Sequence, residues 1–159
     1  MRILIVSDTH GRNGKFRVVY EKVKPVDMVL HLGDVEGTER ELESTVDCPL
    51  YAVAGNNDFF TQLPMEQEIQ IGTYRAFLCH GHYYRVSMTN RLLADEARAR
   101  NCSLALYGHT HKPVIQYDKG VTLLNPGSLS FPRQDNHRPS YMMMEIDGQG
   151  EAHFTICYL

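Results

Sequence analysis

The 159-residue sequence has no long apolar run, no CxxC pair and no cluster of basic residues. No stretch approaches the roughly 18 apolar residues of a membrane span, and the N-terminal run MRILIV is too short for a signal peptide. The formal net charge is −3 with Lys and Arg scattered, so nucleic-acid backbone is not an indicated partner. Four widely spaced cysteines (Cys48, Cys79, Cys102 and Cys157) predict reduced thiols in a cytoplasmic protein.

The length predicts a single domain over residues 1–159. Short apolar runs alternate first with helical patterns and later with hairpins, which is typical of a layered α/β or mixed-sheet domain. We expect buried strands at 2–7, 27–32, 49–54 and 103–107, and helices at 13–24, 37–45 and 87–101. Leu92, Leu93 and Ala97 should form the apolar face of the last helix. Hairpins are expected around residues 72–73, 118–120 and 147–148.

Chemically active residues follow five of the apolar runs. These runs continue into "SDTH", "LGD", "AGNND", "CHGH" and "YGHTH", so a carboxylate, amide or imidazole follows each predicted strand. Ligand sites in such sheets form beyond the carboxyl ends of the strands. Glycines 33, 55, 81 and 108 allow the sharp turns that this requires. The side chains should therefore converge on one pocket.

The residue types in this set favour a divalent metal ion. Imidazole nitrogen with carboxylate and amide oxygen suits hard-to-borderline ions, and the absence of cysteine argues against structural zinc. The set exceeds what one ion needs, which favours two ions that share a bridging carboxylate about 3.5–4 Å apart. The seven candidate ligands are Asp8, His10, Asp34, Asn56, His80, His109 and His111.

In their order along the chain, the five motifs resemble those of the calcineurin-like metallophosphoesterase superfamily, in particular its small bacterial and archaeal phosphodiesterases. The resemblance implies an αββα sandwich of two mixed sheets flanked by helices. It also implies one ion held by Asp8, His10, Asp34 and His111, and a second held by Asp34, Asn56, His80 and His109, with Asp34 as the bridge. A hydroxide that bridges both ions would attack a small-molecule phosphodiester. Mn²⁺ is the first choice of metal, with Ni²⁺, Mg²⁺, Fe²⁺ or Zn²⁺ as alternatives.

One position departs from the phosphatase members of that family, which have histidine after the motif asparagine. This chain has Asn57 there, and an amide donates hydrogen bonds without acting as a general acid near neutral pH. The departure disfavours phosphomonoesters, and His82 is a candidate replacement. His109 and Asn57 are expected beside the scissile group, and Arg133 is a candidate for binding a substrate phosphate.

Simpler interpretations remain for several of these residues. Asn57 could only form a turn, Arg133 could be an ordinary surface residue, and His31 fits a buried supporting role. Two alternative functions also remain: a phosphomonoesterase at the same site, and a non-catalytic protein-binding scaffold such as the retromer subunit of this fold. An exposed "FTICYL" edge would favour a homo-oligomer.

Overall fold

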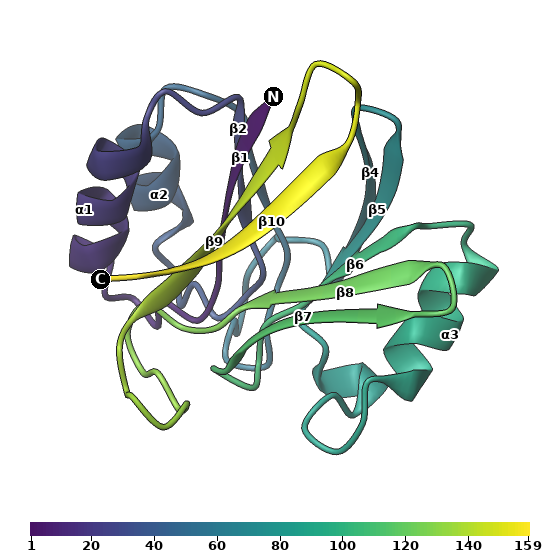
Figure 1. The fold of residues 1–159 in the computed structure, drawn as a ribbon. Coiled ribbons are helices and arrows are strands. Elements are labelled where there is room, and N and C mark those ends of the chain that lie inside the picture. The colour runs from purple at the N-terminus through teal and green to yellow at the C-terminus, as the bar shows by residue number, and fades with distance from the viewer.

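The computed structural model describes residues 1–159 as two five-stranded mixed sheets packed face to face, with helices on the outside (Figure 1). Sheet A has the order β10-β9-β1-β2-β3, and sheet B has the order β4-β5-β6-β8-β7. The strands are β1 (Arg2–Val6), β2 (Met28–His31), β3 (Leu50–Ala52), β4 (Glu66–Ile71), β5 (Tyr74–Cys79), β6 (Leu104–Leu106), β7 (Pro113–Asp118), β8 (Val121–Pro126), β9 (Ser140–Ile146) and β10 (Ala152–Tyr158). The helices are α1 (Gly14–Val23), α2 (Glu39–Thr45), the 3-10 helix η1 (His82–Tyr84) and α3 (Arg91–Ala99).

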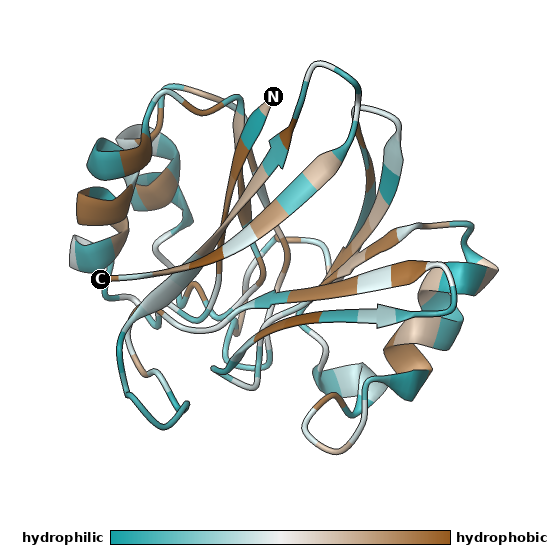
Figure 2. Cartoon of the chain, in the orientation of Figure 1, coloured by the Kyte–Doolittle hydropathy of each residue, from teal (hydrophilic) through white to brown (hydrophobic).

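Side-chain alternation along the strands explains the layers. In β1, Ile3 and Ile5 join the core between the sheets, whereas Leu4 and Val6 pack against α1 and α2. The methionine run of β9 divides in the same way between those two cores. A third core lies between sheet B and α3. Brown apolar strands therefore occupy the interior in Figure 2, and the helices alternate brown with teal.

The architecture confirms the predicted α/β sandwich, with one correction in its last helix. That helix begins at Arg91, not at residue 87, and its buried face is Leu93, Ala94 and Ala97. Leu92 is 45% exposed, so its placement on the apolar face is wrong. The 87–90 segment instead forms turns, because Met88 and Thr89 N–H groups bond to the Arg85 carbonyl. No helix of the structure is both long and apolar enough to cross a membrane.

The topology brings the polar strand ends to one edge of the molecule. Strands β1, β2 and β3 run parallel in sheet A, and β5, β6 and β8 run parallel in sheet B. Carboxyl ends of parallel strands meet at a common edge, which lies in the lower part of Figure 1. Two hydrogen bonds join the two sheets there: the His80 Nδ1 contacts the Leu32 carbonyl, and the His109 N–H donates to Asp8 Oδ2.

Candidate metal centre

Four of the predicted ligands form a compact cluster. Asp8, His10, Asp34 and His111 each present one ligand atom, and these atoms lie within 4.8 Å of one another. The Nε2 of His111 is 3.1 Å from Asp8 Oδ1 and 3.4 Å from the Nε2 of His10. Donor atoms bound to one ion at about 2.1 Å lie about 3–3.5 Å apart, so these spacings suit a shared cation.

The orientation of the histidines leaves their Nε2 atoms free for a metal ion. The Nδ1 of His10 is 2.7 Å from Glu36 Oε1, the Nδ1 of His80 is 2.7 Å from the Leu32 carbonyl, and the Nδ1 of His111 is 2.7 Å from the Phe131 carbonyl. In the neutral rings each Nδ1–H donates to its oxygen, and the unprotonated Nε2 then points into the site. Metal-ligating histidines are normally fixed in this way.

The remaining ligands gather on the other side of Asp34. Asn56 Oδ1 lies 2.9 Å from the Nδ1 of His109 and 3.1 Å from the Nε2 of His80. Asp34 Oδ2 is 3.5 Å from the Nε2 of His80 and 3.6 Å from the Nε2 of His10. The carboxylate of Asp34 thus stands between the two groups of side chains, where a shared ligand would have to be.

Asp8 provides an independent test of whether a cation fits. Its side chain is fully buried, and Oδ1 accepts no hydrogen bond, although such an atom is costly to leave unpaired. Burial acts to raise the pKa of Asp8, but interactions with His111 and His80 outweigh it and lower the pKa overall. Burial acts to lower the pKa of His111, but its contact with Asp8 outweighs it and raises the pKa. Both shifts favour a carboxylate beside a protonated imidazole, and a metal ion that displaced the His111 proton would supply the same positive charge beside Asp8, so the residues fit a metal ion.

The backbone around the cluster is unusual. Five of the seven candidate ligands have positive φ, a conformation that costs non-glycine residues on the order of 1 kcal/mol each. They are Asp8, His10, Asp34, His109 and His111. Hydrogen bonds from Ser128 Oγ to the Asp8 carbonyl (2.8 Å) and from the His10 N–H to the Asp34 carbonyl (2.9 Å) hold this backbone. Strain of this kind clusters at functional sites.

Two supporting carboxylates have roles that the sequence prediction missed. Glu36 orients His10, as described above. Asp58 is buried and accepts hydrogen bonds from the N–H groups of Asp34 (2.7 Å), Gly55 (2.7 Å) and Glu36 (2.6 Å), so it fixes the loop that carries Asp34. Asp58 belongs to the quoted "GNND" motif, which was its one visible signal, whereas "DVEG" gave no indication of Glu36.

Asn57 lies at the site but its side chain is engaged with Asp34. The Asn57 Nδ2 donates to Asp34 Oδ2 at 2.8 Å, and its backbone N–H donates to Asp34 Oδ1 at 2.9 Å. Both oxygens of the central carboxylate are therefore oriented by one residue. The predicted role of Asn57 in substrate binding stays a prediction, and positioning of Asp34 is the role that these contacts support.

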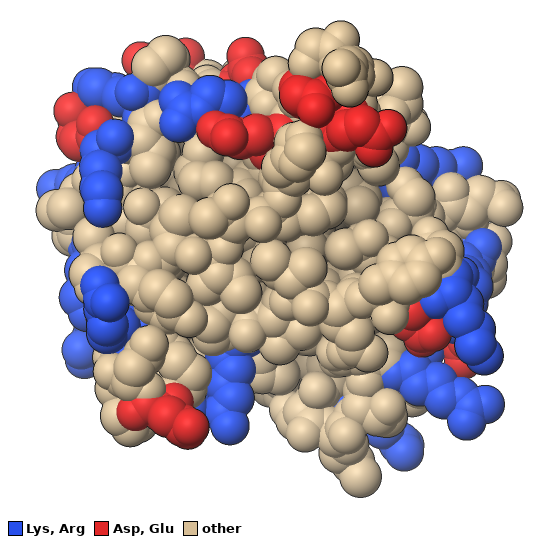
Figure 3. All heavy atoms as spheres, viewed as in Figure 1, with Lys and Arg blue, Asp and Glu red and all other residues tan.

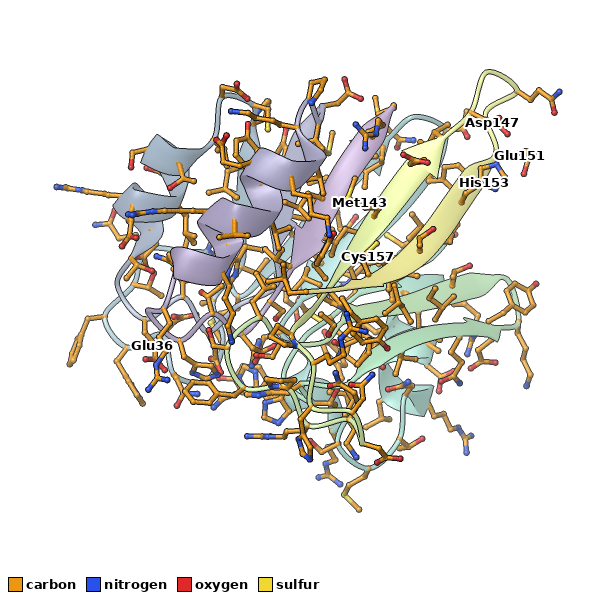
Figure 4. The ribbon with its side chains drawn as sticks, turned by 60° about the vertical axis from the view of Figure 1, so that its left-hand side comes forward. Glu36, Met143, Asp147, Glu151, His153 and Cys157 are labelled. Atoms are coloured by element: carbon orange, nitrogen blue, oxygen red, sulfur yellow. The ribbon has the colours of Figure 1, made fainter.

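The structure also locates the other candidates. The ring centroid of His82 lies 5.4 Å from that of His80 and 6.1 Å from that of His109. Burial is the main cause that lowers the pKa of His82, and the two neighbouring histidines lower it further. Arg133 is exposed, and its backbone N–H donates to the His111 carbonyl at 3.1 Å. His153 pairs with Asp147 at 2.9 Å at the tip of the β9–β10 hairpin. Figure 4 shows that tip at the opposite end of the molecule from Glu36, so His153 is outside the site.

His31 is a supporting residue with a testable effect on stability. It is fully buried, its Nε2 lies 3.1 Å from Thr9 Oγ1, and burial lowers its pKa to about 4. Between the ordinary value near 6.5 and about 4, the unfolded chain binds a proton that the folded chain does not. We therefore expect this residue to reduce the free energy of unfolding by roughly 2–3 kcal/mol as the pH falls from 7 to 4.5.

Urea unfolding of metal-stripped wild-type protein and of His31→Gln at several pH values measures this effect. The variant lacks the titrating group, so its stability should decrease less on acidification. The candidate ligands are present in both proteins, so their contribution cancels in the comparison. Parallel pH profiles for the two proteins would contradict the assignment.

Comparisons with known proteins agree with this geometry. A profile of the calcineurin-like phosphoesterase superfamily domain matches residues 1–149. A probable metallophosphoesterase of Mycoplasma genitalium is 30% identical over 99% of this chain and 95% of its own length. A phosphodiesterase of Methanocaldococcus jannaschii is 27% identical over 80% of this chain and 83% of its own length.

Solved structures show the same fold. A predicted phosphoesterase of Streptococcus pneumoniae superposes with a TM-score of 0.84 at 29% identity, covering 99% of this chain and 88% of that one. The protein Vps29 of Entamoeba histolytica, solved in complex with Zn²⁺, has a TM-score of 0.79 at 23% identity over 99% of both chains, a likeness of fold alone. By sequence, fold and the composition of its cluster, the chain belongs to the calcineurin-like phosphoesterase superfamily, a family of metal-dependent phosphoester hydrolases.

Proposed function

We propose that the chain hydrolyses phosphodiesters at a centre of two divalent metal ions, for which Mn²⁺ is the first candidate. The observation that carries the proposal is the buried Asp8 Oδ1, which accepts no hydrogen bond and lies 3.1 Å from the Nε2 of His111. In the neutral ring the Nδ1–H of His111 donates to the Phe131 carbonyl, so the Nε2 is free to bind a metal ion. Asp8, His10, Asp34 and His111 would hold one ion, and Asp34, Asn56, His80 and His109 the other. When bound, such ions lower the pKa of water and neutralise phosphoryl oxygens.

The chain's own residues would organise the site around the substrate. Asn57 holds both Asp34 oxygens in place, and Asp58 holds the Asp34 backbone. His109 is half-buried at the mouth of the site and keeps its Nε2 free to contact a phosphoryl oxygen. A diester suits this arrangement, because its scissile group brings one negative charge and needs no histidine as general acid when the leaving group is good.

Phosphomonoester hydrolysis is less well supported. The side chain that stands at the position after the motif asparagine is an amide, and its Nδ2 is already bonded to Asp34. An amide cannot protonate a leaving group near neutral pH. His82 carries a ring near His80 and His109, but burial keeps its pKa low, so at neutral pH it holds only a neutral N–H.

Hydrolysis of bis(4-nitrophenyl) phosphate and of 4-nitrophenyl phosphate tests the proposal. Metal-stripped protein should be inactive, and added Mn²⁺, Ni²⁺, Mg²⁺, Fe²⁺ or Zn²⁺ should restore diesterase activity with a much weaker monoesterase activity. A dominant monoesterase activity would overturn the substrate class. Bound metal without activity toward either ester would favour the alternative of a non-catalytic protein-binding scaffold.

A further inference from the structure

A cavity of about 410 Å³ adjoins the candidate metal centre on the side of the β6–β7 turn. This basic cavity is lined by Val86, Ser87, Asn90, Tyr107, Thr110, Lys112, Val114 and Arg133. Thr110 lies in the chain between the candidate ligands His109 and His111, and Arg133 is joined to His111 by its backbone hydrogen bond. The size falls within the range of about 300–1,000 Å³ that is common for small-molecule sites.

The charge of the cavity is one-sided. Lys112 and Arg133 both line it, and no Asp or Glu does. Neither side chain takes part in any salt bridge of the structure, whereas Arg2, Arg17, Arg75 and Arg100 all pair with carboxylates. The chain as a whole has a net charge of −3, so two unpaired cations in one cavity are a local feature. Such a site favours an anion with more than one oxygen.

The rest of the lining is suited to the body of a substrate. Val86, Tyr107 and Val114 provide apolar surface, and the Tyr107 hydroxyl is held by Asn90 Nδ2 at 2.9 Å. Thr110 Oγ1 is fixed by Asn125 Nδ2 at 3.1 Å and by the Lys112 N–H at 3.3 Å. In Figure 1 the 127–139 loop, which carries Arg133, and the 82–90 segment both lie along the lower part of the molecule, beside the β6–β7 turn. Loops therefore form the sides of the cavity, around the hydrogen-bonded side chains of Tyr107 and Thr110.

Resting on the proposed diesterase function, we propose that the basic cavity binds a second, terminal phosphate on one ester arm of the substrate. The scissile diester lies at the metal centre, the arm crosses Thr110, and Lys112 and Arg133 hold the terminal phosphate. The preferred substrate class is accordingly a phosphodiester with an additional phosphate monoester, of which a 5′-phosphorylated dinucleotide is the simplest example. The electrostatics of two cations act on binding, so the preference should appear mainly in KM.

The experiment compares the dinucleotides pTpT and TpT, which differ only in the terminal phosphate. For the wild-type protein loaded with Mn²⁺, kcat/KM should be about tenfold or more higher for pTpT. In the Lys112→Gln/Arg133→Gln variant the ratio of the two values should fall toward one. Arg40→Gln, which removes an exposed arginine of α2, should keep the wild-type ratio. Thermal melting of each variant checks that it is folded.

Two outcomes would overturn the inference without touching the proposed function: equal kcat/KM for both dinucleotides, or a preference that survives the double substitution. If no metal gives hydrolysis of either dinucleotide or of the aryl diester, the proposed function fails, and calorimetry on metal-stripped protein then decides the inference. Tighter binding of pTpT than of TpT, lost in the double variant, would support the basic cavity. Equal binding of the two would overturn it.

Discussion

Asp34→Ala is expected to reduce kcat/KM for bis(4-nitrophenyl) phosphate by at least about 10³-fold. Asp34 Oδ2 lies 3.6 Å from the Nε2 of His10 and 3.5 Å from that of His80, whereas Asp8 Oδ1 lies 3.9 and 4.0 Å from them, so the substitution removes the carboxylate nearest to both groups. Metal analysis of the purified variant should show less than one tightly held ion per chain. A matching His109→Ala variant should also lose activity, while the cluster of Asp8, His10 and His111 would still hold one ion.

Two further variants separate chemistry from folding. Asp34→Asn keeps the size of the side chain and the acceptor for the Asn57 N–H, so its fold should persist while activity still falls. Asp95→Ala removes an exposed carboxylate of α3 and should keep wild-type activity. Full activity in Asp34→Asn together with unchanged metal content would contradict the shared role of Asp34.

Gly55→Ala is expected both to destabilise the fold and to reduce activity. A Cβ at this position would lie 2.2 Å from Asp34 Oδ1 and 2.5 Å from the Asp34 backbone nitrogen. Both atoms are fixed, the first by the Asn57 N–H and the second by Asp58. Overpacking of a rigid site costs about 1–3 kcal/mol, which in a chain of this size lowers Tm by roughly 2–12 °C.

The new methyl group should also displace the Asp34 side chain and so disturb the candidate metal centre. Because the clash is with the shared carboxylate, activity should fall much further than the loss of folded protein explains at a temperature where the variant is folded. Gly148→Ala is the matched control, since nothing lies within 4 Å of a Cβ there and the residue needs no positive φ. Its Tm and activity should equal those of the wild type. Normal metal content in Gly55→Ala would refute this explanation.

Much of the fold could be predicted because buried strands are short apolar runs. "RILIV" and "MVLH" became β1 and β2, and the five polar motifs lie at the strand ends where the pattern placed them. The order of strands in each sheet was not readable, since it depends on long-range pairing that no local pattern encodes. The beginning of α3 was misplaced because Ser87–Asn90 has no breaker, and the observed turns there depend on the Arg85 carbonyl.

The supporting contacts of the site were harder to predict than its ligands. The structure brings all seven candidate ligands together, and their roles in binding metal stay predictions. Two of the histidine Nδ1 partners are backbone carbonyls, of Leu32 and Phe131, and any residue type could supply these. Of the two cations of the basic cavity, Arg133 was a predicted phosphate-binding residue, but Lys112 was not, because the two are 21 positions apart and line one cavity only after β8 has returned along sheet B.

The distribution of charged side chains on the surface bears on the expectation that the substrate is a small molecule, not a nucleic acid. On the face drawn in Figure 3 the blue and red side chains lie around the periphery, and the centre is tan. A nucleic-acid duplex would require a continuous basic stripe, which this face does not have. The pTpT comparison tests the expectation of a small-molecule substrate directly.

The position of β1 inside sheet A bears on how the chain is made. Strand β1 pairs on one side with β2 and on the other with β9, which begins only at Ser140. Until residues 140–146 emerge, one edge of β1 has no partner, and an open apolar edge invites association with other chains. Native-like closure of the sheet therefore waits until β9 has been synthesised. A nascent chain stalled before β9 should be captured by chaperones, and a full-length one should escape them.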